Sequence, residues 1–124
     1  MMKIVSWNCR GIGSRTKEEA IRSLIRTEDP VILLIQETKL EDSAFLQVSK
    51  KLWNKCKAKA ISASGASGGL GTLWNASKFS VISETLNTHW LFLKLQHVDS
   101  KEIISLFNVY IPVNVGEKRL VSNP

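Results

Sequence analysis

Three polar side chains in this sequence stand where short apolar runs end, and their types suit phosphate chemistry. Asn8 follows the first of these runs, Glu37 follows a second, and Tyr110 closes the last. Mg²⁺ prefers oxygen ligands and keeps several waters, so a carboxylate, an amide oxygen and a substrate phosphate would suit its shell. A phenol hydroxyl nearby could hold a phosphoryl oxygen or position the nucleophile in metal-assisted hydrolysis of a phosphodiester. Each residue also has an ordinary structural interpretation: Asn8 as a turn residue, Glu37 as a loop carboxylate and Tyr110 as a packing residue.

A strand–helix–strand unit is predicted to bring the first two of these residues together. Residues 3–7 have the composition of a strand, and residues 31–35 are apolar on both faces, which is typical of a strand buried in a covered sheet. Between them, Thr16 and Glu19 form a capping box that predicts a helix start, and Pro30 predicts the helix end. Because the carboxyl ends of parallel strands meet at one edge of a sheet, the amide and the carboxylate are expected at the same edge.

The middle of the chain predicts a second helix and an edge strand. Asp42 or Ser43 is expected to cap the helix. Its expected buried face consists of Phe45, Leu46, Leu52 and Trp53. An edge strand is expected over 58–63, followed by a glycine-rich segment over 64–71. The lysines at 50, 51, 55, 57 and 59 are interpreted as a solvated face rather than a phosphate track.

The last third of the chain predicts β-structure. Residues 90–97 alternate between two faces, one of which is formed by leucines, and residues 103–110 follow after a turn at Asp99 and Ser100, which predicts a hairpin. His97 is interpreted as an edge or core histidine. By the two-residue period of a strand, one face of the last strand carries Ile104, Leu106, Asn108 and Tyr110. Residues 117–120 are interpreted as the start of another helix.

Length and charge restrict the class of protein. The chain has 124 residues, which suits one domain with a core of its own. No apolar run is long enough to span a bilayer and the start does not have the pattern of a signal peptide, so an intracellular rather than a secreted or membrane protein is expected. Cys9 and Cys56 predict neither a disulfide framework nor a zinc site. The net charge of +6 favours a polyanionic partner.

Four short motifs resemble the endonuclease/exonuclease/phosphatase superfamily, which is also called DNase I-like. They are Ser6-Trp7-Asn8-Cys9-Arg10-Gly11, Ile35-Gln36-Glu37-Thr38, Ser67-Gly68-Gly69-Leu70 with Trp74, and Asn108-Val109-Tyr110-Ile111-Pro112. The order and the residues of these motifs are most similar to those of the endonuclease domain of plant LINE-type non-LTR retrotransposons. The resemblance extends over residues 1–124 but corresponds only to the N-terminal half of the family's domain. It implies a truncated DNase I-like α/β sandwich, with the first sheet, its covering helices and part of the second sheet.

The same resemblance assigns roles to individual residues. Asn8 and Glu37 match the metal-site amide and carboxylate, which implies Mg²⁺ or Mn²⁺ as cofactor, and Tyr110 completes the implied catalytic set. Arg10 and Asn108 are the implied contacts to phosphate or nucleic acid. Arg10 is also a departure, since related apurinic endonucleases often carry an acidic residue there. DNA is the implied partner, and action on genomic DNA would imply a nuclear location.

Two family motifs are absent from these residues. The superfamily has a Gly-Asp-x-Asn motif after the tyrosine segment and a Ser-Asp-His motif near the end of its domain, and neither occurs here. We therefore expect a Mg²⁺-dependent endonuclease-like domain that is inactive by itself, because groups that work as a unit lose activity together. The alternatives are a non-catalytic basic module that binds nucleic acid or dimerises, and a phospholipid or inositol phosphate hydrolase of the same superfamily. A half-domain is also expected to expose sheet surface and to self-associate through Val5, Trp7, Leu91, Leu93 and Ile104.

Overall fold

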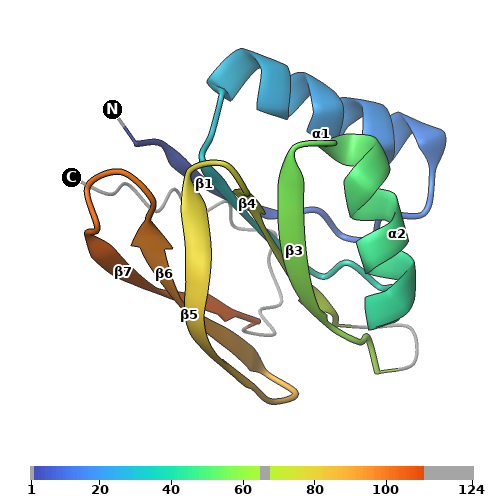
Figure 1. Ribbon diagram of the computed structural model, residues 1–124. Helices are drawn as coiled ribbons and strands as arrows, with labels where there is room; N and C mark the ends of the chain where they lie inside the picture. Colours follow the sequence, from blue (N-terminus) through green and yellow to red (C-terminus); the bar gives the residue numbers. More distant parts are fainter. Residues whose placement is uncertain (1, 65–67, 111–124) are drawn as a thin grey trace.

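The computed structural model describes residues 2–64 and 68–110, which form two sheets and two helices (Figure 1). The elements follow one another along the chain in this order: β1 (Ile4–Asn8), α1 (Arg15–Glu28), β2 (Ile32–Gln36), α2 (Asp42–Leu52), β3 (Cys56–Ile61), β4 (Leu70–Asn75), β5 (Phe79–Leu86), β6 (Trp90–His97) and β7 (Ile103–Val109). The predicted mixed α/β sandwich is confirmed. The segment from Ile111 onwards, with Pro112 and the helix start predicted at 117–120, lies outside the described residues.

The first sheet has the strand order β1-β2-β4-β3. Its β1 and β2 strands run parallel, as the predicted strand–helix–strand unit requires, and the other pairs are antiparallel. The strand β2 is buried from Ile32 to Ile35 because both of its faces are covered. Both helices pack on the same face of this sheet (Figure 1), where they enclose a core that includes Ile21, Leu33 and Phe45. The predicted edge strand is β3, at the end of the sheet.

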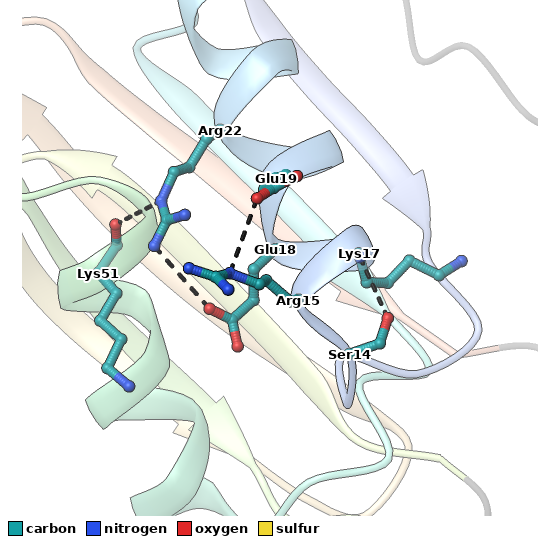
Figure 2. Close-up of polar contacts among 7 residues, drawn as sticks. All are labelled: Ser14, Arg15, Lys17, Glu18, Glu19, Arg22 and Lys51. Carbon is teal, nitrogen blue, oxygen red and sulfur yellow. Dashed lines mark hydrogen bonds and ion pairs between the residues drawn. The ribbon is translucent and has the colours of Figure 1, made fainter.

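The helix α1 begins two residues before the predicted position. Its N-cap is Ser14, whose side chain accepts a hydrogen bond from the backbone N–H of Lys17 at 3.2 Å, so the capping box predicted at Thr16 is wrong (Figure 2). The helix ends where Pro30 predicts, with Asp29 in the left-handed conformation as its C-cap. Figure 2 also shows Arg22 donating to the backbone carbonyl of Lys51 at 3.0 Å, a contact that ties α1 to α2.

The helix α2 begins at Asp42, so the cap predicted at Asp42 or Ser43 is wrong. The residue at the N-cap position is Glu41, which makes no side-chain capping bond. Phe45 and Leu52 are buried as predicted, whereas Leu46 is 38% exposed. Ser49 takes a place on the buried face instead, and its hydroxyl donates to the carbonyl oxygen of Leu46 at 2.7 Å. Because Ser49 is polar, the pattern of apolar residues did not predict that this position is buried.

The second sheet has the order β5-β6-β7 and packs on the other face of the first sheet (Figure 1). The predicted hairpin of β6 and β7 is confirmed, and the leucine face of β6 is buried as its alternation indicates. His97 is the last residue of β6 and packs edge-on against Phe79 at 5.2 Å between ring centroids. The strand β5 was not predicted, because most of its residues are exposed and its sequence carries no clear apolar alternation.

The prediction of the exposed surface is wrong, because the residues expected there pack in or against the core. Leu91 and Leu93 are each 1% exposed and lie in the core between the sheets, against which Ile104 also packs. Val5 and Trp7 pack against the core beneath the helices. The exposed surface lies instead on the outer face of β6 and β7, which no helix within the described residues covers (Figure 1). We call this surface, formed by Trp90, Phe92, Phe107 and Val109, the aromatic face.

Within the described residues, neither helix combines the length and the apolar character needed to cross a membrane.

Candidate active site

The candidate site lies where β1, β2 and β7 end on one side of the sandwich. Asn8 is the last residue of β1, rather than the residue after it, and pairs with Gln36, the last residue of β2. Glu37 follows Gln36 directly. The predicted meeting of an amide and a carboxylate at one sheet edge is therefore what the backbone of the first sheet produces.

The backbone of Glu37 is held in an unusual conformation. Its φ is 54°, in the left-handed region that residues other than glycine rarely adopt. The backbone N–H of Gly11 donates to the Glu37 carbonyl at 2.6 Å, and the N–H of Cys9 donates to the Gln36 carbonyl at 3.1 Å. On the other side, the N–H of Thr38 donates to the Gly69 carbonyl at 3.1 Å. Because hydrogen bonds from two loops hold the segment on both sides, the surrounding structure compensates for the local strain.

Gly69 allows the second of these loops to approach closely. Its φ is 92°, and a Cβ atom at this position would collide with the Thr38 hydroxyl and come within 3.2 Å of the Lys39 backbone nitrogen. Only glycine satisfies both the conformation and the close contact. The glycine-rich motif therefore has a structural role, because it lets residues 68–69 support the segment that carries Glu37.

Tyr110 reaches the same region from the second sheet. It follows β7, and its backbone N–H donates to the carbonyl of His89 at 3.0 Å. As predicted, it shares a face with Leu106 and Asn108, the face that packs toward the first sheet. Partial burial raises the pKa of the Tyr110 phenol, and the charge of Glu37 and a hydrogen bond with its side chain raise this pKa further. The phenol and the carboxylate are therefore neighbours.

Asn8 and Arg10 form a tight turn beside this pair. The Asn8 side-chain oxygen accepts a hydrogen bond from the backbone N–H of Arg10 at 3.3 Å, and Arg10 has a positive φ of 54°. The Arg10 side chain is exposed to solvent. An exposed guanidinium next to the site is available to a phosphate, so the contact predicted for Arg10 stays a prediction.

Asn108 does not lie where a phosphate contact needs it. It is 1% exposed, and its side-chain nitrogen donates to the Ile35 carbonyl at 3.2 Å, the Gly71 carbonyl at 3.0 Å and the Thr72 hydroxyl at 3.2 Å. Its side-chain oxygen accepts from Gln36 at 2.8 Å. Because the amide is buried and bonded to the protein on both its atoms, we withdraw the phosphate contact for Asn108. The sequence placed it on the correct face of β7 but could not show what that face meets.

The donor set at this edge suits a hard divalent cation in type. A carboxylate on Glu37 and an amide oxygen on Asn8 are the oxygen ligands that Mg²⁺ and Mn²⁺ accept. The ion pairs found between described residues do not involve Glu37. Within residues 2–64 and 68–110 there is no group of three or more His, Cys, Asp or Glu side chains that could hold a metal. Asn8 and Glu37 alone would be only part of a metal shell, and their role as metal ligands stays a prediction.

Gln36 is a site-supporting residue that the sequence analysis did not single out. Its side-chain nitrogen donates to the Ser6 hydroxyl at 3.0 Å as well as to Asn108, so it joins three strands. The signal available in the sequence was its position: a polar residue at the end of an otherwise apolar strand, directly before the candidate carboxylate.

Comparison with known proteins identifies the family and the fold. Residues 5–116 match the model of the Endonuclease/Exonuclease/phosphatase family. No curated protein sequence matches. Among solved structures, a mannosyl-6-phosphatase of Bacteroides thetaiotaomicron has a TM-score of 0.69 at 11% identity, over 86% of this chain and 50% of its own. An AP endonuclease of Leishmania major has a TM-score of 0.66 at 20% identity, over 90% of this chain and 40% of its own. An AP endonuclease of Archaeoglobus fulgidus has a TM-score of 0.67 at 18% identity, over 90% of this chain and 42% of its own.

At these identities the solved structures establish the fold alone, and it is the truncated DNase I-like α/β sandwich that the sequence predicted. The chain spans half or less of the length of these three structures. The family model, in contrast, spans most of the chain and includes Asn8, Glu37 and Tyr110. This chain belongs to the endonuclease/exonuclease/phosphatase family.

Proposed function

We propose that this chain forms the N-terminal part of a Mg²⁺- or Mn²⁺-dependent endonuclease domain that hydrolyses phosphodiester bonds in DNA. The observation that carries the proposal is the pairing of Asn8, at the end of β1, with Gln36, the residue before Glu37, because it puts an amide and a carboxylate at one sheet edge. The motif resemblance to LINE-type retrotransposons supports DNA as the substrate, and so does the net charge of +6. The AP endonucleases among the structural neighbours are also compatible with this substrate.

Each of the residues has a distinct role in this proposal. Glu37 and Asn8 hold the divalent ion through oxygen atoms. A bound divalent ion polarises a phosphoryl oxygen and stabilises the charge that develops on it. Tyr110 donates its phenol hydrogen bond to a phosphate oxygen when substrate displaces it from Glu37. Its raised pKa keeps the phenol protonated, and therefore a donor, throughout the neutral pH range. Arg10 contributes a positive charge at the rim of the site.

The 124 residues do not contain the Gly-Asp-x-Asn and Ser-Asp-His motifs of the family. In the proposal the first motif orients the nucleophile and the second supplies an aspartate–histidine pair, so the polypeptide by itself binds the metal but does not cleave DNA. The substrate and the location of the whole domain, nuclear if it acts on genomic DNA, follow from the same proposal.

Metal binding by the purified chain tests the proposal directly. Mn²⁺ is titrated into the protein and the free ion is measured by electron paramagnetic resonance. We expect binding that is lost in Glu37→Gln and weakened in Asn8→Ala. The matched control is Glu102→Gln, which removes the same charge close to the start of β7, at the opposite end of that strand from Tyr110. Equal Mn²⁺ binding by wild type and Glu37→Gln would refute the metal site.

A plasmid-nicking assay with Mg²⁺ tests the second half of the proposal. We expect no nicking by the 124-residue chain, together with DNA binding that weakens steeply as salt increases. Nicking that disappears in Glu37→Gln would show that the chain is active by itself and would contradict the expected inactivity.

The aromatic face gives specific support to one alternative, a module that self-associates. Phe107 is 59% exposed and Val109 is 42% exposed, and the Phe107 ring packs against Phe92 with 4.6 Å between ring centroids. Contiguous exposed apolar side chains favour association. Sedimentation analysis of wild type and Phe107→Lys tests this: association that is lost in the variant would support the alternative, and a concentration-independent monomer would exclude it.

A further inference from the structure

Polar contacts between the two sheets include a partly exposed ion pair, at 3.1 Å, between Lys59 on β3 and Glu84 on β5, and a buried hydrogen-bonded side chain on β7. Around this side chain, the buried core between the sheets is apolar, and apolar burial does not specify one sliding position of one sheet over the other. The exception is Asn108, whose buried side chain donates to three acceptors on β2 and β4 and accepts from Gln36 at 2.8 Å. We call this set of hydrogen bonds the inter-sheet link. A buried amide with every bond satisfied favours a single arrangement, because any displacement leaves a polar group unpaired.

The inter-sheet link lies between the two segments that carry the candidate site. Gln36 directly precedes Glu37, and Asn108 lies two residues before Tyr110 on the same face of β7. The bond between Gln36 and Asn108 therefore ties the backbone that carries the carboxylate to the backbone that carries the phenol. The inward-facing residue that precedes Asn108 on β7 is Leu106, which makes apolar contacts with the core between the sheets.

We propose that Gln36 and Asn108 are positioning residues, whose hydrogen bond holds the Tyr110 side chain against Glu37. The role concerns the phosphoesterase site and so rests on the proposed function, although the positioning itself is measurable without metal or substrate. Neither residue touches the substrate in this proposal. The competing interpretation is that the inter-sheet link only stabilises the fold and that Tyr110 finds Glu37 without it.

The experiment uses the fact that Tyr110 is the one tyrosine in the chain. Incorporation of fluorotyrosine gives a single fluorine resonance that reports the surroundings of this side chain. Glu37→Gln changes the charge next to the phenol and is expected to shift the resonance. The size of that shift, measured in different backgrounds, is the coupling between the two residues, as in a double-mutant cycle.

The shift caused by Glu37→Gln is measured in three further variants, which distinguish a positioning role from a purely structural one. Asn108→Leu removes the whole inter-sheet link, and Gln36→Met removes the bond between Gln36 and Asn108 while Asn108 keeps its bonds to β2 and β4. Ser105→Ala is the matched control, since Ser105 lies on the exposed, outer face of the same strand. We expect the Glu37→Gln shift to be about twofold smaller or less in Asn108→Leu and Gln36→Met, and unchanged in Ser105→Ala.

The same shift in all backgrounds, with cooperative unfolding retained, would overturn the proposal. If Asn108→Leu does not fold, Gln36→Met decides by the same criterion, and failure of both variants to fold would also overturn it in favour of a structural role. The Mn²⁺ titration keeps the two proposals apart. If the fluorine shift caused by Glu37→Gln becomes smaller in these variants while they still bind Mn²⁺, the positioning role is supported and the metal site is not contradicted. Intact coupling in every background, combined with Mn²⁺ binding that depends on Glu37, refutes only the inter-sheet link.

Discussion

Substitution of Gly71 by alanine gives a strong test of how the first sheet and its helices fit together. Gly71 is buried in β4, and a Cβ atom there would collide with the ring of Phe45 on α2. Phe45 is itself fully buried, so its ring has no free space into which it can move. The helix must shift away from the sheet or the ring must leave its rotamer.

The cost follows from two opposing effects. Overpacking of a filled core destabilises by about 1–3 kcal/mol. Replacement of a glycine in a strand by alanine recovers about 0.5–1 kcal/mol, because the unfolded chain loses freedom. We therefore expect Gly71→Ala to lower the free energy of unfolding by about 1–2 kcal/mol, which corresponds to a Tm lower by about 4–8 °C for a chain of this size.

Denaturant unfolding followed by tryptophan fluorescence measures the effect. Gly13→Ala is the matched control, because a Cβ atom at Gly13 meets nothing within 4 Å, and its stability is expected within about 0.5 kcal/mol of wild type. Adding Phe45→Leu to Gly71→Ala makes room for the new methyl, so the double variant is expected to be more stable than the sum of the single effects. A Gly71→Ala chain as stable as wild type would refute the packing described here.

Three further predictions concern the helix cap and two titratable side chains. Ser14→Ala is expected to cost about 1 kcal/mol in thermal or denaturant unfolding, whereas Thr16→Ala stays within about 0.5 kcal/mol; the reverse order would restore the capping box. Burial raises the pKa of the Cys9 thiol, so alkylation at neutral pH is expected to be slower in the native chain than in the denatured one, and equal rates would contradict its burial. The pKa of Tyr110 lies above its ordinary value of 10.0, so folding is stabilised below that pH and the contribution is lost as the pH rises through the native pKa. Glu37→Gln is expected to lower that pKa, and an unchanged tyrosinate absorbance titration would contradict the contact.

The sequence predicted those parts of the molecule that depend on short stretches of chain. Local patterns were enough to find both helices, the buried strand predicted over 31–35 and observed at Ile32–Gln36, and the leucine face of β6, because each pattern reports which residues are apolar. The cap of α1 was missed because Ser14 and Thr16 are both good capping residues, and only the backbone shows which one accepts the bond from Lys17.

Features that depend on contacts between distant segments could not be predicted in the same way. The pattern of β7 placed Asn108 and Tyr110 on one face, but not the identity of the element that this face meets, so Asn108 was expected at a phosphate and is found in the core. For the same reason, Leu91 and Leu93 were expected at the surface and lie between the sheets. The positive φ of Glu37 also comes from distant contacts, with Gly11 and the loop at Gly69.

The inter-sheet link has a consequence for the order in which the chain assembles. Gln36 and Asn108 are separated by 72 positions, and the contact between them needs the last described strand. Contacts over such sequence distances form late, because closure of the long intervening loop is entropically costly. As synthesis proceeds from the amino terminus, the strands of the first sheet can pair as soon as β4 has emerged. At that point Tyr110 has not yet been placed next to Glu37. The nascent polypeptide thus passes through a stage in which the first sheet has formed but Glu37 and Tyr110 have not yet come together.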